Sequence, residues 1–287
     1  MEGMERKERV LQAVEGDNLK VEILEFERLD GAQHVDSAEK IYFANQAGIK
    51  MRRIRLTLDD TSVNIEPGLL HYMKGDLEIK SPAGGGGKSG GGLRGFGRAM
   101  MRKVTSGESM FQTEIAGTGV IYLEPSFKHY LIEEMDDQEY IADKGIFVAA
   151  SAEIEVGSKM QGNVSSALFG GEGLFQTALN GSGIAIFASP VPLSELEMFE
   201  LEDEKMSVDG SFAILRDGQL EFAAETSTRS VVGFFTSGEK ILQTFTGTGR
   251  LWIAPTQEFY DDIEEARLAQ LVQAQSAARK AAEEDDD

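Results

Sequence analysis

Gly107-Glu108-Ser109-Met110-Phe111-Gln112-Thr113, with Gly117-Thr118-Gly119 shortly after it, is a stretch that the chain contains in three versions. The second version holds Glu172, Gln176 and Gly181-Ser182-Gly183, and the third holds Glu239, Gln243 and Gly247-Thr248-Gly249. All three read G-E-x-x-[FL]-Q-T, followed within four residues by G-[TS]-G. Recurrence at a near-constant spacing indicates a repeat architecture. We therefore expect Gln112, Gln176 and Gln243 to occupy equivalent positions.

Each version has the pattern of β-structure. Phe111, Thr113 and Ile115 alternate with polar residues, which is the period of a strand with one buried face. The G-x-G element predicts a turn or bulge where the backbone has φ > 0 or approaches another strand closely. An apolar strand follows and ends at a proline, at Pro125, Pro190 and Pro255. We expect a β-hairpin or two consecutive strands in each copy.

A glycine turn also precedes each motif, at Gly68, Gly145 and Gly210, and leads into a predicted strand pair. The sequence thus predicts an all-β fold of three tandem β-sandwich-like repeats in a closed, pseudo-threefold arrangement, because closure would cover the strand edges. The expected three-repeat domain spans residues 62–260. Its repeats cover 62–128, 139–193 and 205–260.

Shorter segments flank this domain. Residues 1–61 predict a strand, a helix and a strand that pack on the first repeat, with Asp36-Ser37 capping the helix and Gly48 just past its end. Arg52, Arg53 and Arg55 interrupt the second of these strands. Residues 261–287 predict a helix and an acidic disordered tail.

Composition limits the function. The 287 residues are 41% hydrophobic and carry a net charge of −21, which favours a soluble protein and disfavours nucleic-acid binding. The chain has no cysteine, so thiolate metal sites and a cysteine nucleophile are excluded. No apolar leader or spanning segment opens the sequence. We expect a cytoplasmic protein, with peripheral membrane contact left open.

One glycine-rich insertion has the opposite charge. Between residues 79 and 107 the chain has six basic residues and no acid. Gly87-Lys88-Ser89 resembles a phosphate-binding loop, but Pro82 stands where that motif requires glycine. The insertion is either a solvated linker or a contact for an acidic partner, a second subunit or an anionic membrane. Its candidate interaction residues are Lys88, Arg94, Phe96, Arg98, Met100, Met101, Arg102 and Lys103.

Other polar features give weaker signals. The repeated polar positions Glu108, Gln112, Glu172, Gln176, Glu239 and Gln243 are expected to bond turns and strands, or to form a polar site near the pseudo-threefold axis. Acidic runs at 133–139 and 195–204 read as solvated connectors. The histidines have no metal-ligand spacing and no nucleophile motif occurs, so we expect no catalytic residue, metal or cofactor.

The three motifs, the glycine-rich insertion and Met73-Lys74-Gly75-Asp76-Leu77-Glu78-Ile79 together resemble the Altered Inheritance of Mitochondria protein 24 family, in its bacterial form. The resemblance covers about residues 60–260. It implies units folded like the subunit of the tryptophan RNA-binding attenuation protein, and no established enzyme activity. That protein's ligand and RNA residues have no matching motif here.

These observations favour a non-enzymatic scaffold or interaction protein with a protein partner or self-association as a homo-oligomer. The alternative is a β protein that binds a small ligand or, less readily given its charge, a nucleic acid.

Overall fold

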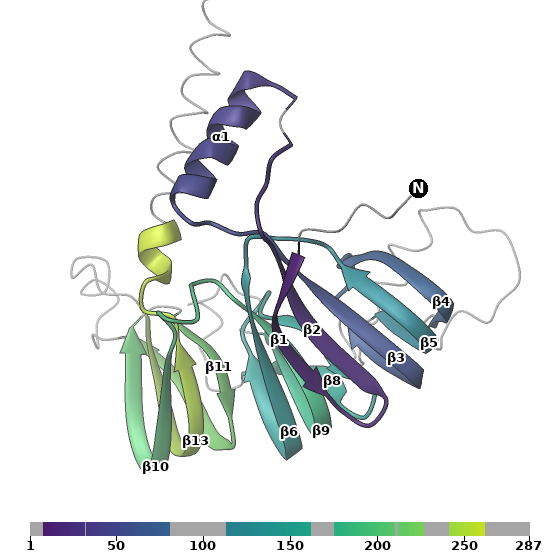
Figure 1. Ribbon diagram of the computed structural model, residues 1–287. Coiled ribbons are helices and arrows are strands. Elements are labelled where there is room, and N and C mark those ends of the chain that lie inside the picture. The colour runs from purple at the N-terminus through teal and green to yellow at the C-terminus, as the bar shows by residue number, and fades with distance from the viewer. Residues whose placement is uncertain are drawn as a thin grey trace, which may run out of the picture.

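The computed structural model describes residues 8–31, 33–80, 113–161, 175–209, 212–226 and 241–261. These residues form one large antiparallel sheet with few helical residues (Figure 1), which confirms the predicted all-β class. The strands are β1 (Glu8–Glu15), β2 (Leu19–Phe26), β3 (Arg52–Ile65), β4 (Leu70–Lys80), β5 (Thr113–Leu123), β6 (His129–Ala142), β7 (Phe147–Ser151), β8 (Glu155–Met160), β9 (Phe175–Ser189), β10 (Glu197–Asp209), β11 (Ala213–Asp217), β12 (Gln219–Thr226) and β13 (Ile241–Ile253). The helix α1 spans Val35–Gln46.

The N-terminal segment has the predicted strand, helix and strand, preceded by β1, which the sequence analysis did not identify. α1 begins at Val35 after His34, which makes no side-chain capping bond, so the predicted Asp36-Ser37 cap is wrong. Gly48 follows the helix with φ 71°, as expected. None of the helix residues is buried, and Figure 1 shows α1 standing away from the strands.

The three arginines of β3 hold the β1–β2 hairpin in place. Arg55 binds both carboxylate oxygens of Glu22 at 2.6 Å. Arg52 lies 2.7 Å from a carboxylate oxygen of Glu25, and Arg53 lies 2.7 Å from one of Glu8. Charged residues in this otherwise apolar strand therefore have a structural role, since each pairs with an acid on the hairpin.

The remaining strands form three groups of similar plan. Group 1 is β3–β5 (residues 52–123), group 2 is β6–β9 (129–189) and group 3 is β10–β13 (197–253). In each group the last strand lies in the middle of the sheet. It pairs on one side with the long first strand and on the other side with the one or two strands that come between them in the sequence. The last strands β5, β9 and β13 run unbroken through G-x-G, so the predicted hairpin at that element is wrong.

The prediction of a close backbone approach at G-x-G is confirmed. A Cβ atom on Gly117 would lie 2.1 Å from the carbonyl oxygen of Asp76, and one on Gly247 would lie 2.2 Å from that of Gln219. At Gly181 the corresponding distance is 2.8 Å. All three glycines have φ between 124° and 130°. Any side chain there would push the facing strand away.

The residue between the two glycines explains the rest of the motif. Each first strand contains a bulge with one aspartate at positive φ, and the backbone N–H of that aspartate donates to the hydroxyl of the G-[TS]-G residue. The donor and acceptor pairs are Asp60 to Thr118 (2.9 Å), Asp137 to Ser182 (2.9 Å) and Asp203 to Thr248 (3.0 Å). The acidic runs read as connectors are therefore largely in β6 and β10, where they contain these bulges.

Neighbouring groups meet through short strand junctions. In the first, β3 pairs with β7 through Val63–Ser151, Asn64–Ala150 and Ile65–Ala149. In the second, β6 pairs with β11 through Tyr140–Asp217, Ile141–Arg216 and Ala142–Leu215. A backbone bond of 2.9 Å follows each junction, from Glu66 to Val148 and from Asp143 to Ile214.

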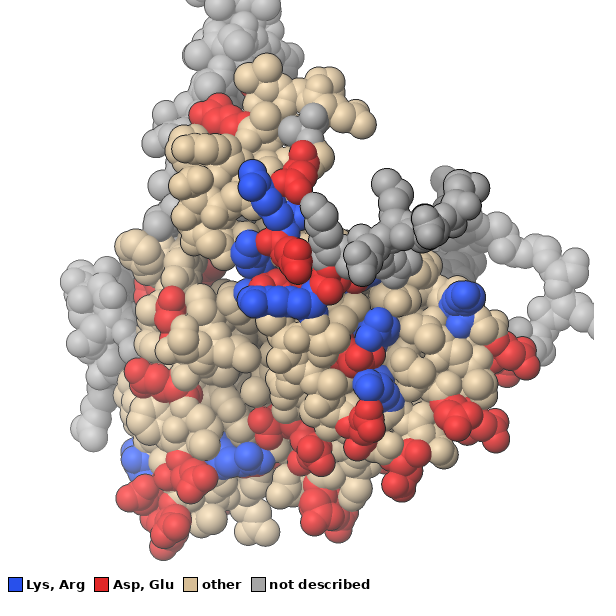
Figure 2. All heavy atoms as spheres, viewed as in Figure 1, with Lys and Arg blue, Asp and Glu red and all other residues tan. Residues whose placement is uncertain are grey.

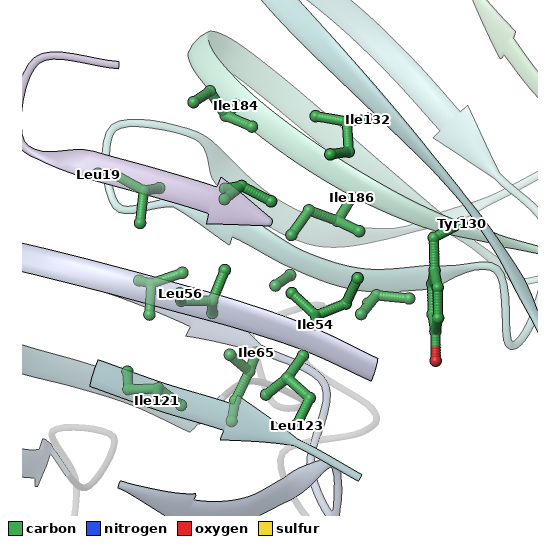
Figure 3. Close-up of a cluster of buried hydrophobic side chains, with 14 of the residues drawn as sticks. Leu19, Ile54, Leu56, Ile65, Ile121, Leu123, Tyr130, Ile132, Ile184 and Ile186 are labelled. Carbon is green, nitrogen blue, oxygen red and sulfur yellow. The ribbon is translucent and has the colours of Figure 1, made fainter. Parts of the chain in front are cut away.

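Apolar side chains of neighbouring groups share cores. Figure 3 shows Ile54 of group 1 close to Ile186 of group 2, in one buried cluster that also contains Leu56 and Ile121 of group 1 and Ile132 of group 2. A second core joins groups 2 and 3. Among the described strands none pairs group 3 with group 1, so the expected closure of the ring is absent.

The predicted equivalence of Gln176 and Gln243 is also wrong. In group 3 the last glycine of G-x-G pairs with Leu201, and Val208, seven residues later, pairs with Gln243. In group 2 the last glycine pairs with Met135, and Ala142, seven residues later, pairs with Thr177 and not with Gln176. The third motif has two residues between Thr244 and Gly247, where the second has three. This one-residue difference moves the glutamine to the other face of the strand.

Candidate functional site

A wide, open groove lies on the described surface between groups 2 and 3. It joins two spaces of about 790 and 340 Å³ that share Glu139, Gly218, Leu220 and Glu221. Gly218 has φ 75° and divides β11 from β12 where the backbone passes close to Gly249. The groove thus forms because the strand path breaks at a glycine in this group.

Arg216 lies in the wall of the groove on β11, whose five residues are all buried. Its guanidinium donates to the Oε1 atom of Gln176 at 3.0 Å. It also lies 5.2 and 5.6 Å from the ring centroids of Phe222 and Phe245. Burial lowers the pKa of Arg216 to about 10, so the group remains charged at neutral pH.

Gln176 connects this arginine to an acid. Burial raises the pKa of the Asp143 carboxyl, and a hydrogen bond with the side chain of Gln176 partly opposes this rise. Asp143 follows β6, Gln176 is in β9 and Arg216 is in β11. The three side chains therefore link both groups across their junction.

A second polar cluster lies nearby. Arg250 donates from its backbone and its side chain to the two carboxylate oxygens of Asp217, at 2.6 and 2.7 Å. The Arg250 side chain also donates to the hydroxyl of Tyr140, which donates to Glu133 at 3.0 Å. Burial raises the pKa of the Glu133 carboxyl and of the Tyr140 hydroxyl. This cluster, like the first, joins group 2 to group 3.

The groove itself has a negative electrostatic character. Asp137, Glu139, Asp203 and Glu221 line it, and Lys159 binds Glu139 at 2.7 Å. Acidic side chains also predominate along the lower part of the face in Figure 2. Such walls suit a neutral polar or cationic ligand better than an anion. Gln161, which lines the groove, has a buried amide nitrogen with no partner among the described residues.

Of the sequence-predicted site residues within the described ranges, Gln176 alone contacts a residue that lines this groove, through its bond with Arg216. Gln243 is buried in β13 and lies opposite Val208 and Ala224. The other positions lie outside the described residues, namely Glu108, Gln112, Glu172 and Glu239 and the whole candidate set from Lys88 to Lys103.

Sequence reasoning did not identify Arg216, Asp217 and Arg250. Their signal is a charge within an apolar strand, as in Ala213-Ile214-Leu215-Arg216-Asp217. A buried charge requires partners, so such a position marks either a structural cluster or a site.

No His, Cys, Asp and Glu cluster that could hold a metal occurs in the described parts of the chain. None of the helices that the structure describes is long and apolar enough to span a bilayer.

Known proteins resemble this chain over most of its length. A family model described as mitochondrial biogenesis AIM24 matches residues 45–256. An uncharacterized protein of Streptococcus pyogenes serotype M6 is 27% identical over 199 residues, which cover 67% of this chain and 76% of that protein. A crystal structure of a Streptococcus pyogenes protein aligns with a TM-score of 0.56 and 20% identity, covering 76% of this chain and 94% of the other. The structural likeness concerns the fold alone.

Proposed function

Because the chain belongs to the mitochondrial biogenesis AIM24 family, we propose that it is a non-enzymatic scaffold or interaction protein built from three tandem copies of one strand unit. The recurrent aspartate bulge, with its bond to Thr118, Ser182 or Thr248, supports the equivalence of the three units. Recurrence of a strained backbone position with the same partner is a stronger sign of duplication than recurrence of apolar residues.

One observation carries the scaffold role. The buried polar side chains beside the groove bind residues of the neighbouring group, as Arg216 binds Gln176 and Arg250 binds Tyr140. A catalytic group needs an unengaged atom in reach of a substrate. These groups instead connect like units, which is the expected arrangement in a protein whose purpose is assembly.

The proposed contact with other molecules is the basic insertion. Each lysine or arginine near an anionic lipid surface contributes about 1 kcal/mol, and salt reduces that contribution. Leu93, Phe96, Met100 and Met101 supply apolar atoms beside the charges. We propose that the protein is cytoplasmic and makes reversible contact with an acidic surface through this insertion.

Co-sedimentation with vesicles tests this contact. The full chain should bind vesicles containing phosphatidylserine and not neutral phosphatidylcholine vesicles, and binding should weaken as salt increases. Exchange of Lys88, Arg94, Arg98, Arg102 and Lys103 for glutamine should abolish binding. The double variant Lys74→Gln/Lys128→Gln, which removes positive charge outside the insertion, serves as the control and should retain binding. Unchanged binding of the fivefold variant would refute the insertion as the contact.

A second candidate function is binding of a small polar or cationic ligand in the groove. Its volume and the unpaired amide nitrogen of Gln161 favour this function. A thermal-shift screen with polar and cationic metabolites should then give a stabilising compound. Gln161→Leu should remove the shift, while Gln12→Leu on β1 should retain it. A shift that survives Gln161→Leu would place the compound elsewhere.

A further inference from the structure

Two strand edges lack the neighbours that their counterparts have. Within the described part of the chain, β10 pairs with β13 alone and β4 pairs with β5 alone. The counterparts of β10 are β3 and β6, and each has a strand partner on both sides. The counterparts of β4 are β7 and β11, and each of these also has a partner on both sides. Among the described strands, the same junction is thus formed twice and left open once.

The register identifies the residues of the open junction. β4, β7 and β11 each have a bulge at the same place relative to the last strand of their group, at Leu70/Tyr72, Phe147/Ala149 and Ala213/Leu215. Residues 72–74 therefore correspond to 149–151 and 215–217. Counting from the aspartate bulges, residues 206–208 correspond to 63–65 and 140–142.

Burial separates the open junction from the two formed ones. All residues of β7 and β11 are buried, whereas residues 72–74 of β4 are half-buried or exposed. On the other side, Val63 and Tyr140 are buried and their counterpart Met206 is half-buried. In the described part of the chain neither edge has a strand partner at these residues, and Met73 and Met206 are less buried than the residues that correspond to them in the formed junctions.

We propose that a second copy of this chain completes the open junction, with residues 206–208 of one copy pairing antiparallel to residues 72–74 of the next. The template gives the register: Met206 opposite Lys74, Ser207 opposite Met73 and Val208 opposite Tyr72. By analogy with the bonds that follow the other junctions, the N–H of Asp209 donates to the carbonyl of His71. This pairing rests on the unit equivalence proposed above and is independent of the vesicle contact.

The geometry favours another copy over the chain's own edge. Groups 1 and 3 are each joined to group 2, and in the described residues they share neither a strand pair nor a buried apolar cluster. β4 and β10 lie at opposite sides of the view in Figure 1. Every copy presents one edge of each kind, so the contact is head to tail and generates a ring or a filament.

The sequence of β10 is consistent with selective pairing. Acidic residues occur at Glu200, Glu202, Asp203 and Glu204, and charges on an edge strand oppose pairing with other chains. Residues 206–208 read Met-Ser-Val and have no charge. The acidic residues thus oppose pairing along the first half of β10, and the uncharged segment coincides with the residues of the proposed junction.

Cysteine cross-linking tests the register directly, because the natural chain has no cysteine. Chains with Met206→Cys and chains with Lys74→Cys are mixed and oxidised gently. Opposed residues of antiparallel strands lie within disulfide range, so this mixture should give about tenfold more covalent dimer than a control mixture of Glu200→Cys and Lys74→Cys. Equal yields from both mixtures would overturn the proposed register.

The double variant Met206→Cys/Lys74→Cys distinguishes the source of the partner edge. A second copy predicts covalent oligomers that dilution before oxidation suppresses. A disulfide that forms within single chains at every dilution would mean that the chain closes on itself, and would overturn the proposal.

A proline variant tests the association without cross-links. The N–H of Asn64, the counterpart of Ser207, points to β7, so Ser207→Pro should remove an outward backbone donor. It also removes the Ser207 hydroxyl, which lies 3.0 Å from that of Thr244, so Ser207→Ala serves as the control for this loss. Sedimentation velocity should show oligomers for the natural chain and for Ser207→Ala, and monomers for Ser207→Pro, with similar melting temperatures for the two variants. Glu200→Pro lies on the same edge outside the junction and should remain oligomeric. A natural chain that is monomeric at all concentrations, or equal behaviour of the two proline variants, would refute the junction.

Discussion

β11 and β4 occupy the same place in their groups and have opposite surroundings. Both lie beside the last strand of the group and both have a bulge near the start. β11 is buried along its whole length because β6 covers its outer edge, whereas β4 contains no buried residue. Position in the unit therefore fixes the backbone path, and the neighbouring group fixes the burial.

The sequences of the two strands already reflect this difference. β11 reads Ala-Ile-Leu-Arg-Asp, and both charges have specific partners: Arg216 donates to Gln176 of group 2, and Asp217 accepts from Arg250 of β13, which also donates to Tyr140 of group 2. β4 reads Leu-His-Tyr-Met-Lys-Gly-Asp-Leu-Glu-Ile-Lys, with polar residues at most alternate positions, as on a strand with one wet face. Equivalent backbone positions thus tolerate different residues according to the contacts that assembly supplies.

The largest expected effect comes from placing one charge at matched positions of a formed and an open junction. Ala150→Asp would bury a carboxylate opposite Asn64 and should cost about 3–5 kcal/mol of unfolding free energy. Met73→Asp, at the corresponding place in β4, should cost about 1 kcal/mol in dilute solution because water reaches it. Urea denaturation measures both. Equal losses would show that β4 is covered within a single chain.

A smaller loss is expected where the last strand approaches its neighbours. Gly247→Ala would place a methyl group against the carbonyl oxygen of Gln219 at positive φ, and should cost about 2–4 kcal/mol. Gly157→Ala on β8 meets no atom within 4 Å and serves as the control. Thermal unfolding should separate the two variants clearly. A stable Gly247→Ala protein would contradict the explanation given for the G-x-G motif.

The edge of β3 provides another contrast with β4, because the β1–β2 hairpin covers it. The hydrogen-bonded guanidinium of Arg55 lowers the pKa of Glu22. The resulting stabilisation is complete above the unfolded carboxyl pKa of about 4.3 and is lost as pH falls through the lower folded value. Glu22→Gln should cost about 1–2 kcal/mol at pH 7, and less at pH 3. A loss that is equal at both pH values would contradict this assignment.

The smallest effect concerns the aspartate bulges, which occur on both covered and free first strands. Thr248→Val and Thr118→Val each remove the hydroxyl that accepts the bulge N–H, and should each cost about 0.5–1.5 kcal/mol. Amide hydrogen exchange at Asp203 and Asp60 should accelerate in the corresponding variant. Exchange that stays unchanged would indicate that the hydroxyl does not protect the bulge.

The sequence predicts much of the local structure because glycine and apolar periodicity act locally. Gly117, Gly181 and Gly247 predict the close approaches between backbone segments, and the alternating pattern of residues 19–26 predicts strand β2. The failures have non-local causes. The strand path through G-x-G depends on a bulge in the facing strand. The ring closure, which the described strands lack, depends on how whole groups of strands pack. The candidate groove could not be foreseen, because its walls meet only after β6 and β11 pair.

The route between β2 and β3 has a practical consequence for labelling. The backbone N–H of Phe26 donates to the carbonyl of Met51 at 2.9 Å, so the strands are already joined where the chain leaves for α1. Since α1 buries no residue, an insertion in this excursion leaves the strand pairing intact. A fluorescent protein spliced between residues 47 and 48 would report energy transfer between neighbouring copies while both strand edges keep their native sequence.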